Sequence, residues 1–191
     1  MMASPSLAPF VWSPEWPAAW AVLAFLTAQR LLELVHAQRN TRALLARGAV
    51  EHGRGHYPAM VAIHATFLGT LWLGTAPDAP MLWPLLIVFA LLQAARLWVL
   101  ATLGPYWTTR IISAPDFPRI IGGPYRFVRH PNYWVVTLEI LTIPLIFGQM
   151  WIAVVWTGLN AAILFVRIRS ENVALQQRTA QKPVARSGSR A

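Results

Sequence analysis

The sequence predicts an all-α integral membrane protein of about five transmembrane helices, the last two forming a helical hairpin. Of its 191 residues, 56% are hydrophobic and only 12% are charged, and ten are Trp. This composition is more apolar than that of an ordinary soluble domain. The apolar residues form long runs, and the basic residues gather between alternate runs. We therefore expect a single membrane-embedded domain over residues 1–191, without a separate soluble domain.

The helices are expected in order along the chain. Apolar runs cover residues 16–35, 58–75 and 81–103, each near the ~20 residues that a helix needs to cross hydrocarbon. Runs 134–147 and 151–166 follow, separated by Gly148 and Gln149, which predict a tight turn. The first of this pair would be only about 21 Å long, so a full or a partial crossing both remain open. Residues 1–15 and 178–191 are expected to be flexible.

The basic residues predict the orientation of the chain. Residues 36–57 hold four arginines, residues 104–133 hold four, and six basic residues follow from 167 onward, while the other connections hold none. By the positive-inside rule, the charged connections and the C-terminus are cytoplasmic and the N-terminus is outside. We expect a multi-pass protein, of the bacterial inner membrane, whose basic face attracts anionic lipids. The net charge of +9 is therefore explained without nucleic-acid binding. We infer no obligatory protein partner.

A dense polar segment precedes the fourth run. Residues 123–133 read Gly-Pro-Tyr-Arg-Phe-Val-Arg-His-Pro-Asn-Tyr. Polar and charged side chains next to a membrane-spanning stretch cost free energy, so their presence indicates a functional role. A second polar element, Arg167-Ile168-Arg169-Ser170-Glu171, follows the fifth run. A hairpin brings both its ends to the same side, so residues 125–133 and 167–171 are expected to meet and to form one site there. Taken alone, Arg167 and Glu171 are spaced as an ordinary i,i+4 ion pair.

These two elements carry a resemblance to a known family. Arg129-His130-Pro131-Asn132-Tyr133 resembles the signature of the isoprenylcysteine carboxyl methyltransferase family, and Arg167 with Glu171 is similar to its second element, an Arg-x-x-x-Glu. The likeness covers residues 117–175 and marks 104–175 as the motif-bearing part. Arg30-Leu-Leu-Glu-Leu and Gly55-His-Tyr-Pro look most like a bacterial branch whose members include O-methyltransferases of alkylpyrones and phenolic lipids. Asn172 departs from the pattern, which often has a second acidic residue there.

The resemblance implies S-adenosylmethionine as the cofactor. A protein that binds S-adenosylmethionine needs an anionic side chain for its ammonium group and hydrogen-bond donors for its carboxylate. It also needs flat or amide side chains for its adenine. The family likeness implies that Glu171 supplies the first, and that Tyr125 and the segment from Arg129 through His130, Pro131 and Asn132 to Tyr133 supply the others. Ile120 is a weaker candidate, through its backbone. Arg167 is expected to face the acceptor.

The expected reaction is methylation of an anionic oxygen on a lipophilic acceptor that comes from the bilayer. Methyl transfer is an in-line displacement, so catalysis can rest mostly on alignment, and an acceptor already ionised needs no general base. Arg167 would orient the anionic oxygen with its planar fork of donors. A prenylated cysteine carboxylate and the acidic enol of an alkylpyrone both fit, and the sequence does not separate them.

Two other functions stay open. Sterol-type membrane reductases, which use NADPH, carry a similar Arg-His-Pro-Asn-Tyr run, although their segment continues into a longer acidic and aromatic tail. A membrane scaffold or transport subunit is the non-enzymatic alternative. A metal site is not expected, because the chain lacks Cys, and His52 and His56 are separated by two glycines without a carboxylate motif.

The remaining ionisable residues have open roles. Glu139 would be costly against lipid, so it is expected to pair with Arg96 or Arg30 or to line the site. Arg30 and Glu33 have i,i+3 spacing, which favours a structural pair. Residues 51–57, Glu-His-Gly-Arg-Gly-His-Tyr, either cap the acceptor pocket or form an ordinary juxtamembrane turn.

Overall fold

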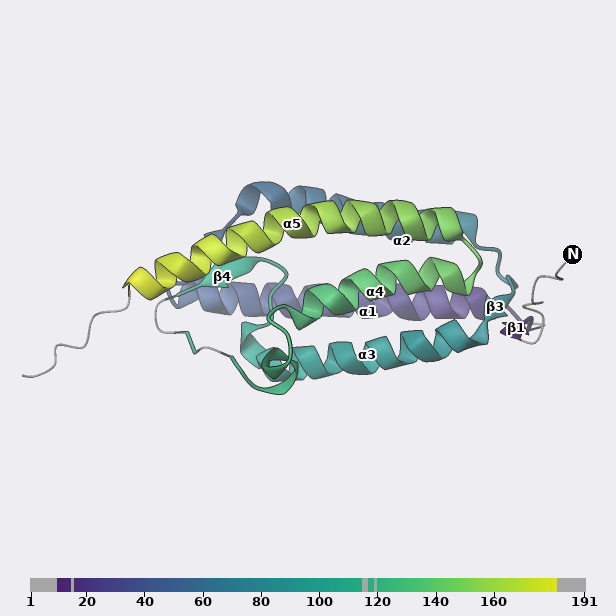
Figure 1. Ribbon diagram of the computed structural model, residues 1–191, viewed down its shortest axis with the longest axis horizontal. Helices are drawn as coiled ribbons and strands as arrows, with labels where there is room; N and C mark the ends of the chain where they lie inside the picture. The colour runs from purple at the N-terminus through teal and green to yellow at the C-terminus, as the bar shows by residue number, and fades with distance from the viewer. Residues whose placement is uncertain (1–9, 15, 115–116, 119, 182–191) are drawn as a thin grey trace, which may run out of the picture.

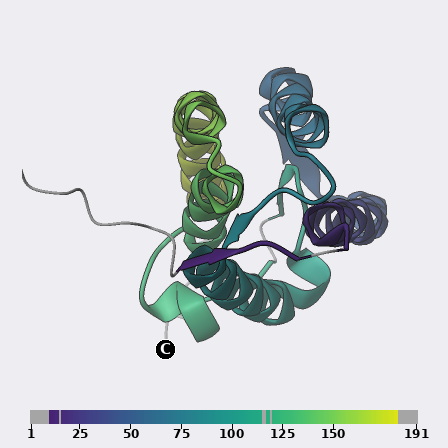
Figure 2. The ribbon, with the colours of Figure 1, turned by 90° about the vertical axis from the view of Figure 1, so that its right-hand side faces the viewer.

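The protein is a bundle of helices that run along one long axis (Figure 1). A computed structural model describes residues 10–14, 16–114, 117–118 and 120–181. In this part of the chain the α-helices are α1 (Ala18–Ala46), α2 (Tyr57–Gly74), α3 (Trp83–Leu103), α4 (Pro131–Ile146) and α5 (Met150–Gln181). Seen along the axis, α1 and α2 lie on one side, α4 and α5 on the other, and α3 lies between α1 and α4 (Figure 2). The predicted all-α membrane-type fold is confirmed.

Short extended and 3-10 segments close the two ends of the bundle. β1 (Val11–Trp12) pairs antiparallel with β3 (Met81–Leu82) at one end, and β2 (Val50–His52) pairs antiparallel with β4 (Ile111–Ser113) at the other. The β2–β4 end also carries the 3-10 turns η2 (Arg54–His56), η3 (Gly104–Tyr106) and η4 (Gly123–Arg126). These pairings were not predicted, because each joins residues that are distant in the sequence and contributes only two or three residues.

Several predicted boundaries were wrong. α1 continues past residue 35 through a polar stretch to Ala46, and α5 continues past residue 166 to Gln181. Residues 178–181, expected to be flexible, are therefore helical, and residues 11 and 12 form a strand. The other residues expected to be flexible, 1–9, 15 and 182–191, lie outside the described part of the chain. Polar residues such as Gln and Arg have good helix propensity, so the end of an apolar run does not end a helix.

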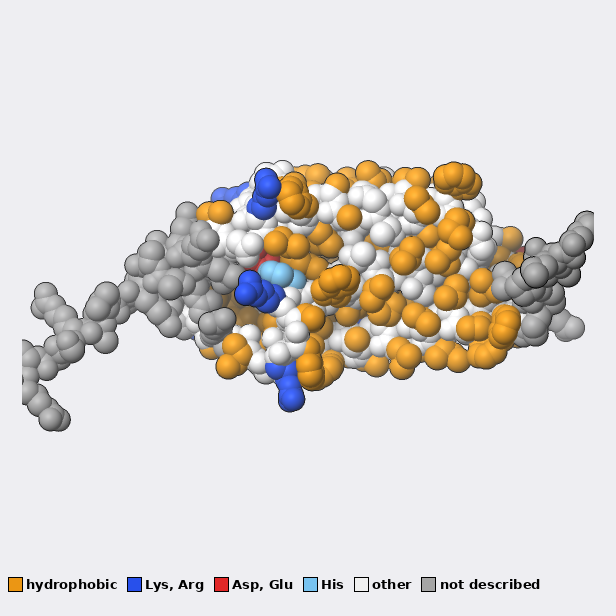
Figure 3. Space-filling model, in the orientation of Figure 1, with side chains coloured by type: hydrophobic (Ala, Val, Ile, Leu, Met, Phe, Trp, Pro, Cys, Tyr) orange, Lys and Arg blue, Asp and Glu red, His pale blue; other side chains and the backbone are white. Residues whose placement is uncertain are grey.

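Three helical segments are long and apolar enough to cross a membrane by length and composition. They are Ala18–Ala46, Trp83–Tyr106 and Met150–Val173, whereas α4 is a shorter apolar helix of 16 residues. α2 has 18 residues and mixes apolar with polar positions. Five crossings therefore remain a prediction. Figure 3 shows the apolar side chains spread along most of one face, with the basic side chains at the end where α5 finishes.

The helical hairpin of α4 and α5 is confirmed. Gly148 has φ 70°, the left-handed conformation that an L side chain rarely adopts, and its amide donates to the carbonyl of Leu145 at 3.1 Å. The turn lets α5 run back along α4, so the end of α5 returns to the end where α4 starts (Figure 1).

Apolar packing holds the β1–β3 half of the bundle together. The largest cluster of buried side chains joins α1, α2, α3 and α4, and includes Leu23, Leu26, Phe67, Leu71, Phe89 and Ile143. Such close packing is the main force that associates helices in lipid. It leaves the opposite half of the bundle for the polar residues.

A network of buried charges joins α1, α3 and α4. Arg30 reaches Glu33 at 2.9 Å and Glu139 at 2.7 Å. Arg96 reaches the same two carboxylates at 2.6 and 2.8 Å. The four formal charges cancel, and Gln93 adds a hydrogen bond to Glu139 at 2.8 Å. The expected Arg30–Glu33 pair is confirmed, and Glu139 pairs with both Arg96 and Arg30. We call Arg30, Glu33, Arg96 and Glu139 the buried quartet.

Candidate functional site

The polar segment before α4 and the last turns of α5 meet at the β2–β4 end. His130 precedes the first residue of α4, and Pro131 occupies the first turn, where its missing N–H costs no hydrogen bond. This start places Tyr133 on the first turn of α4, beside Arg167 and Glu171, which are one turn apart on α5. The expected meeting of residues 125–133 with residues 167–171 therefore occurs in the structure.

The hydroxyl of Tyr133 links the two residues of α5. It donates to Oε2 of Glu171 at 2.6 Å and accepts from Nε of Arg167 at 2.9 Å. Arg167 is only 7% exposed, and its Nη1 also contacts the sulfur of Met60 on α2 at 3.0 Å. The guanidinium is thus held between α2 and α4, with its position fixed from both sides. Glu171 is more open, because its side chain is 30% exposed.

His130 and Tyr133 form a flat surface beside Glu171. Their rings are stacked, with centroids 5.2 Å apart and planes 13° apart. Nδ1 of His130 lies 3.7 Å from Oε2 of Glu171, too far for a hydrogen bond. A stacked pair of this kind suits a flat heterocycle such as adenine.

Asn132 has an unused acceptor. Its Oδ1 is buried and has no hydrogen-bond partner among the residues that the structure describes. Buried polar atoms in native proteins usually have a partner. An acceptor left free beside the His130–Tyr133 stack is consistent with a bound molecule that donates to it, such as one with an adenine amino group or ribose hydroxyls.

Tyr125 lies close to the same carboxylate. Burial, and then the negative charge of Glu171, raise the pKa of the Tyr125 phenol well above its usual value. The phenol is therefore neutral and remains a hydrogen-bond donor. The ring packs with Trp107 and Val99, which fixes η4 against α3.

Gly123 sets the position of η4. Its φ is 55°, and a Cβ atom on it would overlap the side chain of Thr102 on α3. Only glycine allows both this backbone conformation and this close approach. The backbone that carries Tyr125 is thereby fixed relative to α3.

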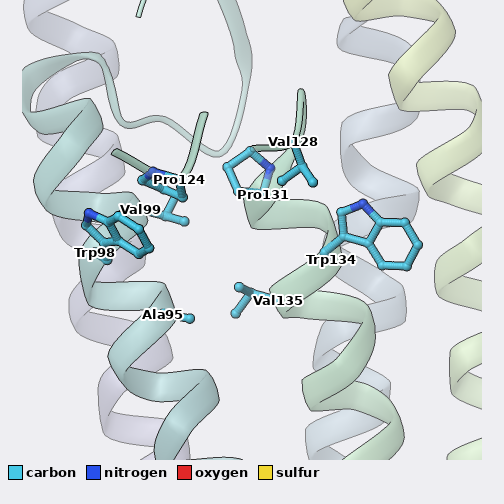
Figure 4. Close-up of a pocket in the computed structure, with 8 residues that line it drawn as sticks. All are labelled: Ala95, Trp98, Val99, Pro124, Val128, Pro131, Trp134 and Val135. Carbon is cyan, nitrogen blue, oxygen red and sulfur yellow. The ribbon is translucent and has the colours of Figure 1, made fainter. Parts of the chain in front are cut away.

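Three other predicted site residues are not hydrogen-bonded to this cluster in the described part of the chain. Arg129 is exposed, and Ile120 is half-buried in the link that precedes η4; neither makes a hydrogen bond or ion pair within the described residues. Pro131 is buried. It helps to line an apolar groove of about 250 Å³ between α3 and α4, whose walls are shown in Figure 4: Ala95, Trp98, Val99, Pro124, Val128, Pro131, Trp134 and Val135.

Residues 51–57 pack against Arg167. The β2–β4 pair holds the start of this loop, where the 4% exposed carboxylate of Glu51 bonds Arg110 at 2.9 Å and Arg54 at 3.2 Å. His52 bonds the hydroxyl of Ser113 at 2.9 Å. Residues of the loop and Arg167 line the same narrow gap, which is too small to hold a water molecule. The loop therefore lies against Arg167, and both interpretations, a cap over the acceptor pocket or an ordinary juxtamembrane turn, stay predictions.

Sequence analysis missed two residues at this site, Met60 and Arg110. Met60 is one of many apolar residues of its run, so nothing in the sequence marks it as the neighbour of Arg167. Arg110 comes to Glu51 through the β2–β4 pairing, and the only available signal was the donor-rich character of residues 51–57. Within the described chain, His, Asp and Glu side chains form no group of three placed to hold a metal ion. The expectation of no metal stays a prediction.

Comparisons with known proteins find one family model and two uncharacterized relatives. The sequence model of the isoprenylcysteine carboxyl methyltransferase family matches residues 85–177. The chain is 38% identical to Uncharacterized protein YpbQ of Bacillus subtilis (strain 168) over 162 residues, which are 83% of this chain and 96% of that protein. It is 25% identical to an uncharacterized protein of Haemophilus influenzae over 168 residues, 80% of this chain and 91% of the other. No solved structure matches the chain.

Proposed function

Because the chain belongs to the isoprenylcysteine carboxyl methyltransferase family, we propose that it is an S-adenosylmethionine-dependent O-methyltransferase of lipophilic acceptors. Family membership and the long apolar helices indicate a multi-pass membrane methyltransferase. The identity of the cofactor, the class of acceptor and the roles of single residues are proposed in addition.

The donor would be held by Glu171 and the segment before α4. Glu171 is the half-open carboxylate that suits an ammonium group, and the His130–Tyr133 stack suits the adenine. The remaining polar groups of S-adenosylmethionine would find one hydrogen-bond acceptor in the free Oδ1 of Asn132 and one hydrogen-bond donor in the neutral phenol of Tyr125. When bound, the donor supplies an activated methyl group on a sulfonium. The weaker candidates, Ile120 and Arg129, would contribute only at the edge of this site.

The acceptor would be held by Arg167. Its guanidinium carries further N–H groups beyond its bonds to Tyr133 and Met60, and such a fork matches the geometry of an anionic oxygen. Met60, which contacts this guanidinium, is a flexible apolar side chain suited to the start of an alkyl or prenyl chain. An acceptor from the bilayer would thus place its chain among the helices and its polar head at Arg167.

The observation that supports this function best is the position of the Tyr133 hydroxyl. It touches Glu171 on one side and Arg167 on the other, so the donor's anchor and the acceptor's clamp are separated by a single oxygen atom. Two reactants bound there are held side by side, and correct alignment can contribute about 7 to 11 kcal/mol to catalysis. Both an isoprenylcysteine-type carboxylate and an alkylpyrone-type enol satisfy this arrangement.

Two measurements test the proposal. Binding of radiolabelled S-adenosylmethionine and of NADPH to the purified protein is compared, and we expect binding of the first only. Lipids from cells with and without the protein are compared by mass spectrometry, and we expect a lipid whose mass differs by one methylene unit. Binding of NADPH without the methyl donor would instead favour a sterol-type reductase, and binding of neither would favour a scaffold or transport subunit.

A further inference from the structure

The groove between α3 and α4 opens on the outer surface of the bundle. All of its wall residues are apolar, and its volume is about 250 Å³ (Figure 4). Trp98 of α3 and Trp134 of α4 are 49% and 63% exposed, so the groove can be reached from outside the bundle. Its volume lies below the ~300 to 1,000 Å³ of small-molecule pockets. The groove therefore suits one flexible apolar chain better than a bulky ligand.

The groove begins at the β2–β4 end and runs inward between the two helices. Pro124, Val128 and Pro131 lie together at one end of it, and Ala95 and Val135 lie at the other (Figure 4). Ala95 is eight residues before the end of α3, which corresponds to about 12 Å along the helix axis. In a membrane, the groove would thus extend from the level of the lipid headgroups into the hydrocarbon.

Two arginines belong to the segment that closes the outer end of the groove. Arg126 and Arg129 alternate with the wall residues Pro124, Val128 and Pro131, and both arginines are exposed. Neither has an ion pair within the described residues. A planar guanidinium binds a phosphate group well, through two parallel N–H donors. Basic positions beside a cleft between membrane helices are also typical sites for anionic lipid headgroups.

Ring contacts join Arg126 to the wall of the groove. Its guanidinium lies over the Phe127 ring, 4.8 Å from the ring centroid. The Phe127 ring in turn packs edge to face against Trp98, with centroids 6.3 Å apart. A molecule whose apolar chain lies against Trp98 would therefore have its polar end near a fixed positive charge.

The methyl acceptor is a less suitable occupant of this groove. Arg167, which is proposed to hold the acceptor, contacts Met60 of α2, and neither α2 nor α5 contributes a wall residue to the groove. The groove also lacks a polar side chain that could orient a reacting group. An apolar chain in the groove would thus belong to a molecule other than the acceptor.

We propose that the α3–α4 groove and Arg126 bind one anionic phospholipid, and that this lipid supports the methyl-donor site. An acyl chain lies between the helices, and the phosphate group contacts the guanidinium of Arg126. Arg129 adds positive charge at the same end of the groove. The lipid site is independent of the proposed methyltransferase function, whereas its effect on the donor rests on that function.

Two prolines of the wall connect the lipid to the donor site. Pro124 precedes Tyr125, and Pro131 lies between His130 and Asn132. The ring of a proline is part of its backbone, so packing against the ring also restrains the neighbouring residues. An acyl chain that contacts both prolines would hold η4 and the first turn of α4, which carry the residues proposed to bind the donor. Bound lipid should therefore raise donor affinity, and bound donor should raise lipid affinity by the same factor.

The headgroup preference is tested by native mass spectrometry of the full chain purified in detergent. Dioleoyl phosphatidylglycerol and dioleoyl phosphatidylcholine are titrated separately, so that only the headgroup differs. We expect one tightly retained phosphatidylglycerol per chain. Arg126→Gln should weaken its retention about fivefold or more and leave phosphatidylcholine unchanged. The control is Arg42→Gln, which removes the same charge from an exposed position of α1, a helix that contributes no wall residue.

The position of the acyl chain is tested by filling the groove. Ala95→Leu places a larger side chain in the wall, and Ala94→Leu makes the same change at an exposed neighbouring position outside the wall. We expect only Ala95→Leu to lose phosphatidylglycerol. Thermal unfolding in detergent checks that both variants are folded.

A second readout of the chain position needs no change in the size of the groove. One equivalent of phosphatidylglycerol with brominated acyl chains is added in detergent, because bromine quenches the fluorescence of a Trp that it contacts. Trp98→Phe and Trp134→Phe should each lose part of the quenched signal. Trp151→Phe, at the start of α5 and the opposite end of the bundle, should keep all of it.

The effect on the donor site is measured by calorimetry with S-adenosylmethionine, with and without phosphatidylglycerol. We expect donor affinity to rise about fivefold or more with the lipid in the wild type and in Arg42→Gln. Ala95→Leu and Arg126→Gln should show a much smaller gain, because they retain less lipid.

Each contrary result has a distinct meaning. Equal retention of the two lipids by the wild type would overturn the headgroup site. Equal lipid loss by Ala94→Leu and Ala95→Leu, or equal loss of quenching in all three Trp variants, would overturn the groove as the place of the chain. Dimers that release the lipid would make this face an interface between copies and overturn the proposal.

The donor measurements separate the lipid site from the proposed function. Donor affinity that is the same with and without phosphatidylglycerol would overturn the coupling. Absence of donor binding under every condition would contradict the proposed function itself, and lipid retention would still test the groove.

Discussion

At the scale of single residues, the site depends on one phenol shared by two side chains of opposite charge. The family signature predicted that Tyr133, Arg167 and Glu171 belong to one site, and the hairpin explains why they meet. Their hydrogen bonds could not be predicted, because they depend on side-chain rotamers at the start of α4 and on α5. Asn172, which departs from the family pattern, is exposed.

Replacement of Glu171 by Gln is expected to weaken donor binding. The substitution removes the negative charge that would pair with the donor's ammonium, and a charge-assisted hydrogen bond contributes about 1.5 to 3 kcal/mol. Isothermal titration calorimetry should therefore show an affinity about 10- to 100-fold lower. Asn172→Gln, at the adjacent exposed position, is the control and should bind as the wild type does. Unchanged affinity in Glu171→Gln would remove this residue from the donor site.

Replacement of Arg167 by Ala is expected to abolish turnover and to leave donor affinity largely intact. The guanidinium is assigned to the acceptor only, so its loss removes the alignment of the oxygen. Turnover is measured by transfer of a radiolabelled methyl group, and donor affinity by calorimetry. The control is Arg169→Ala, because Arg169 is an exposed arginine of the same helix that stacks on Phe165. Wild-type turnover in Arg167→Ala would disprove the clamp.

At the scale of elements, the positions of the helices were predictable and their ends were not. Apolar runs located all five α-helices of the described chain, because a helix that lies in lipid or packs in an apolar bundle needs such a run. The ends of α1 and α5 lie in polar sequence. There, helix propensity rather than hydropathy determines where the helix stops. The strands β2 and β4 and the turn η4 depend on contacts between residues that are distant in the sequence. A local sequence pattern therefore does not predict them.

Replacement of Gly123 by Ala is expected to displace η4 and to weaken donor binding. The left-handed backbone at φ 55° costs about 1 to 2 kcal/mol for any residue with a Cβ atom, and the overlap with Thr102 adds to this. Thermal unfolding in detergent and calorimetry with the donor are the measurements. Gly122→Ala is the matched control, since its φ is −87° and a Cβ atom there meets nothing within 4 Å. Equal behaviour of the two variants would show that η4 does not position the site.

At the scale of the whole molecule, the buried quartet links three helices through the apolar interior. Sequence analysis predicted the Arg30–Glu33 pair and left Glu139 either to pair with Arg96 or Arg30 or to line the site, because a charged residue in an apolar run is costly against lipid. It did not predict that both arginines share both carboxylates, since that depends on the relative rotation of α1, α3 and α4.

Replacement of Glu139 by Gln is expected to destabilise the bundle. Two arginines lose a common partner while staying buried, and breaking one buried pair can cost about 3 to 5 kcal/mol. The midpoint of thermal unfolding in detergent should fall by several degrees. Adding Arg30→Gln to this variant should recover part of the loss, because the charges balance again. Asp78→Asn, an exposed carboxylate at the β1–β3 end, should change nothing. A Glu139→Gln midpoint equal to that of the wild type would refute this role.

The orientation predicted from the basic residues can be tested directly, because the chain has no Cys. Single substitutions Asp78→Cys and Arg126→Cys place one thiol near each end of the bundle, both at exposed positions. A membrane-impermeant maleimide should label Asp78→Cys in intact cells, and Arg126→Cys only after the cells are opened. The reverse pattern would place the site on the outer side of the membrane.

The quartet also has a consequence for biogenesis. The ribosome delivers the helices in order, and α1 reaches the translocon with Arg30 and Glu33 already paired, whereas α3 brings an unbalanced Arg96 and α4 an unbalanced Glu139. A lone charge opposes insertion by about 2.5 to 3.5 kcal/mol, a large penalty for a helix of only 16 residues. α4 should thus insert into lipid efficiently only when α3 is still at the lateral gate of the translocon, where Arg96 can pair with Glu139. Synthesis of the chain as two fragments split between these helices should then leave α4 outside the bilayer, although α5 is long and apolar enough to insert by itself.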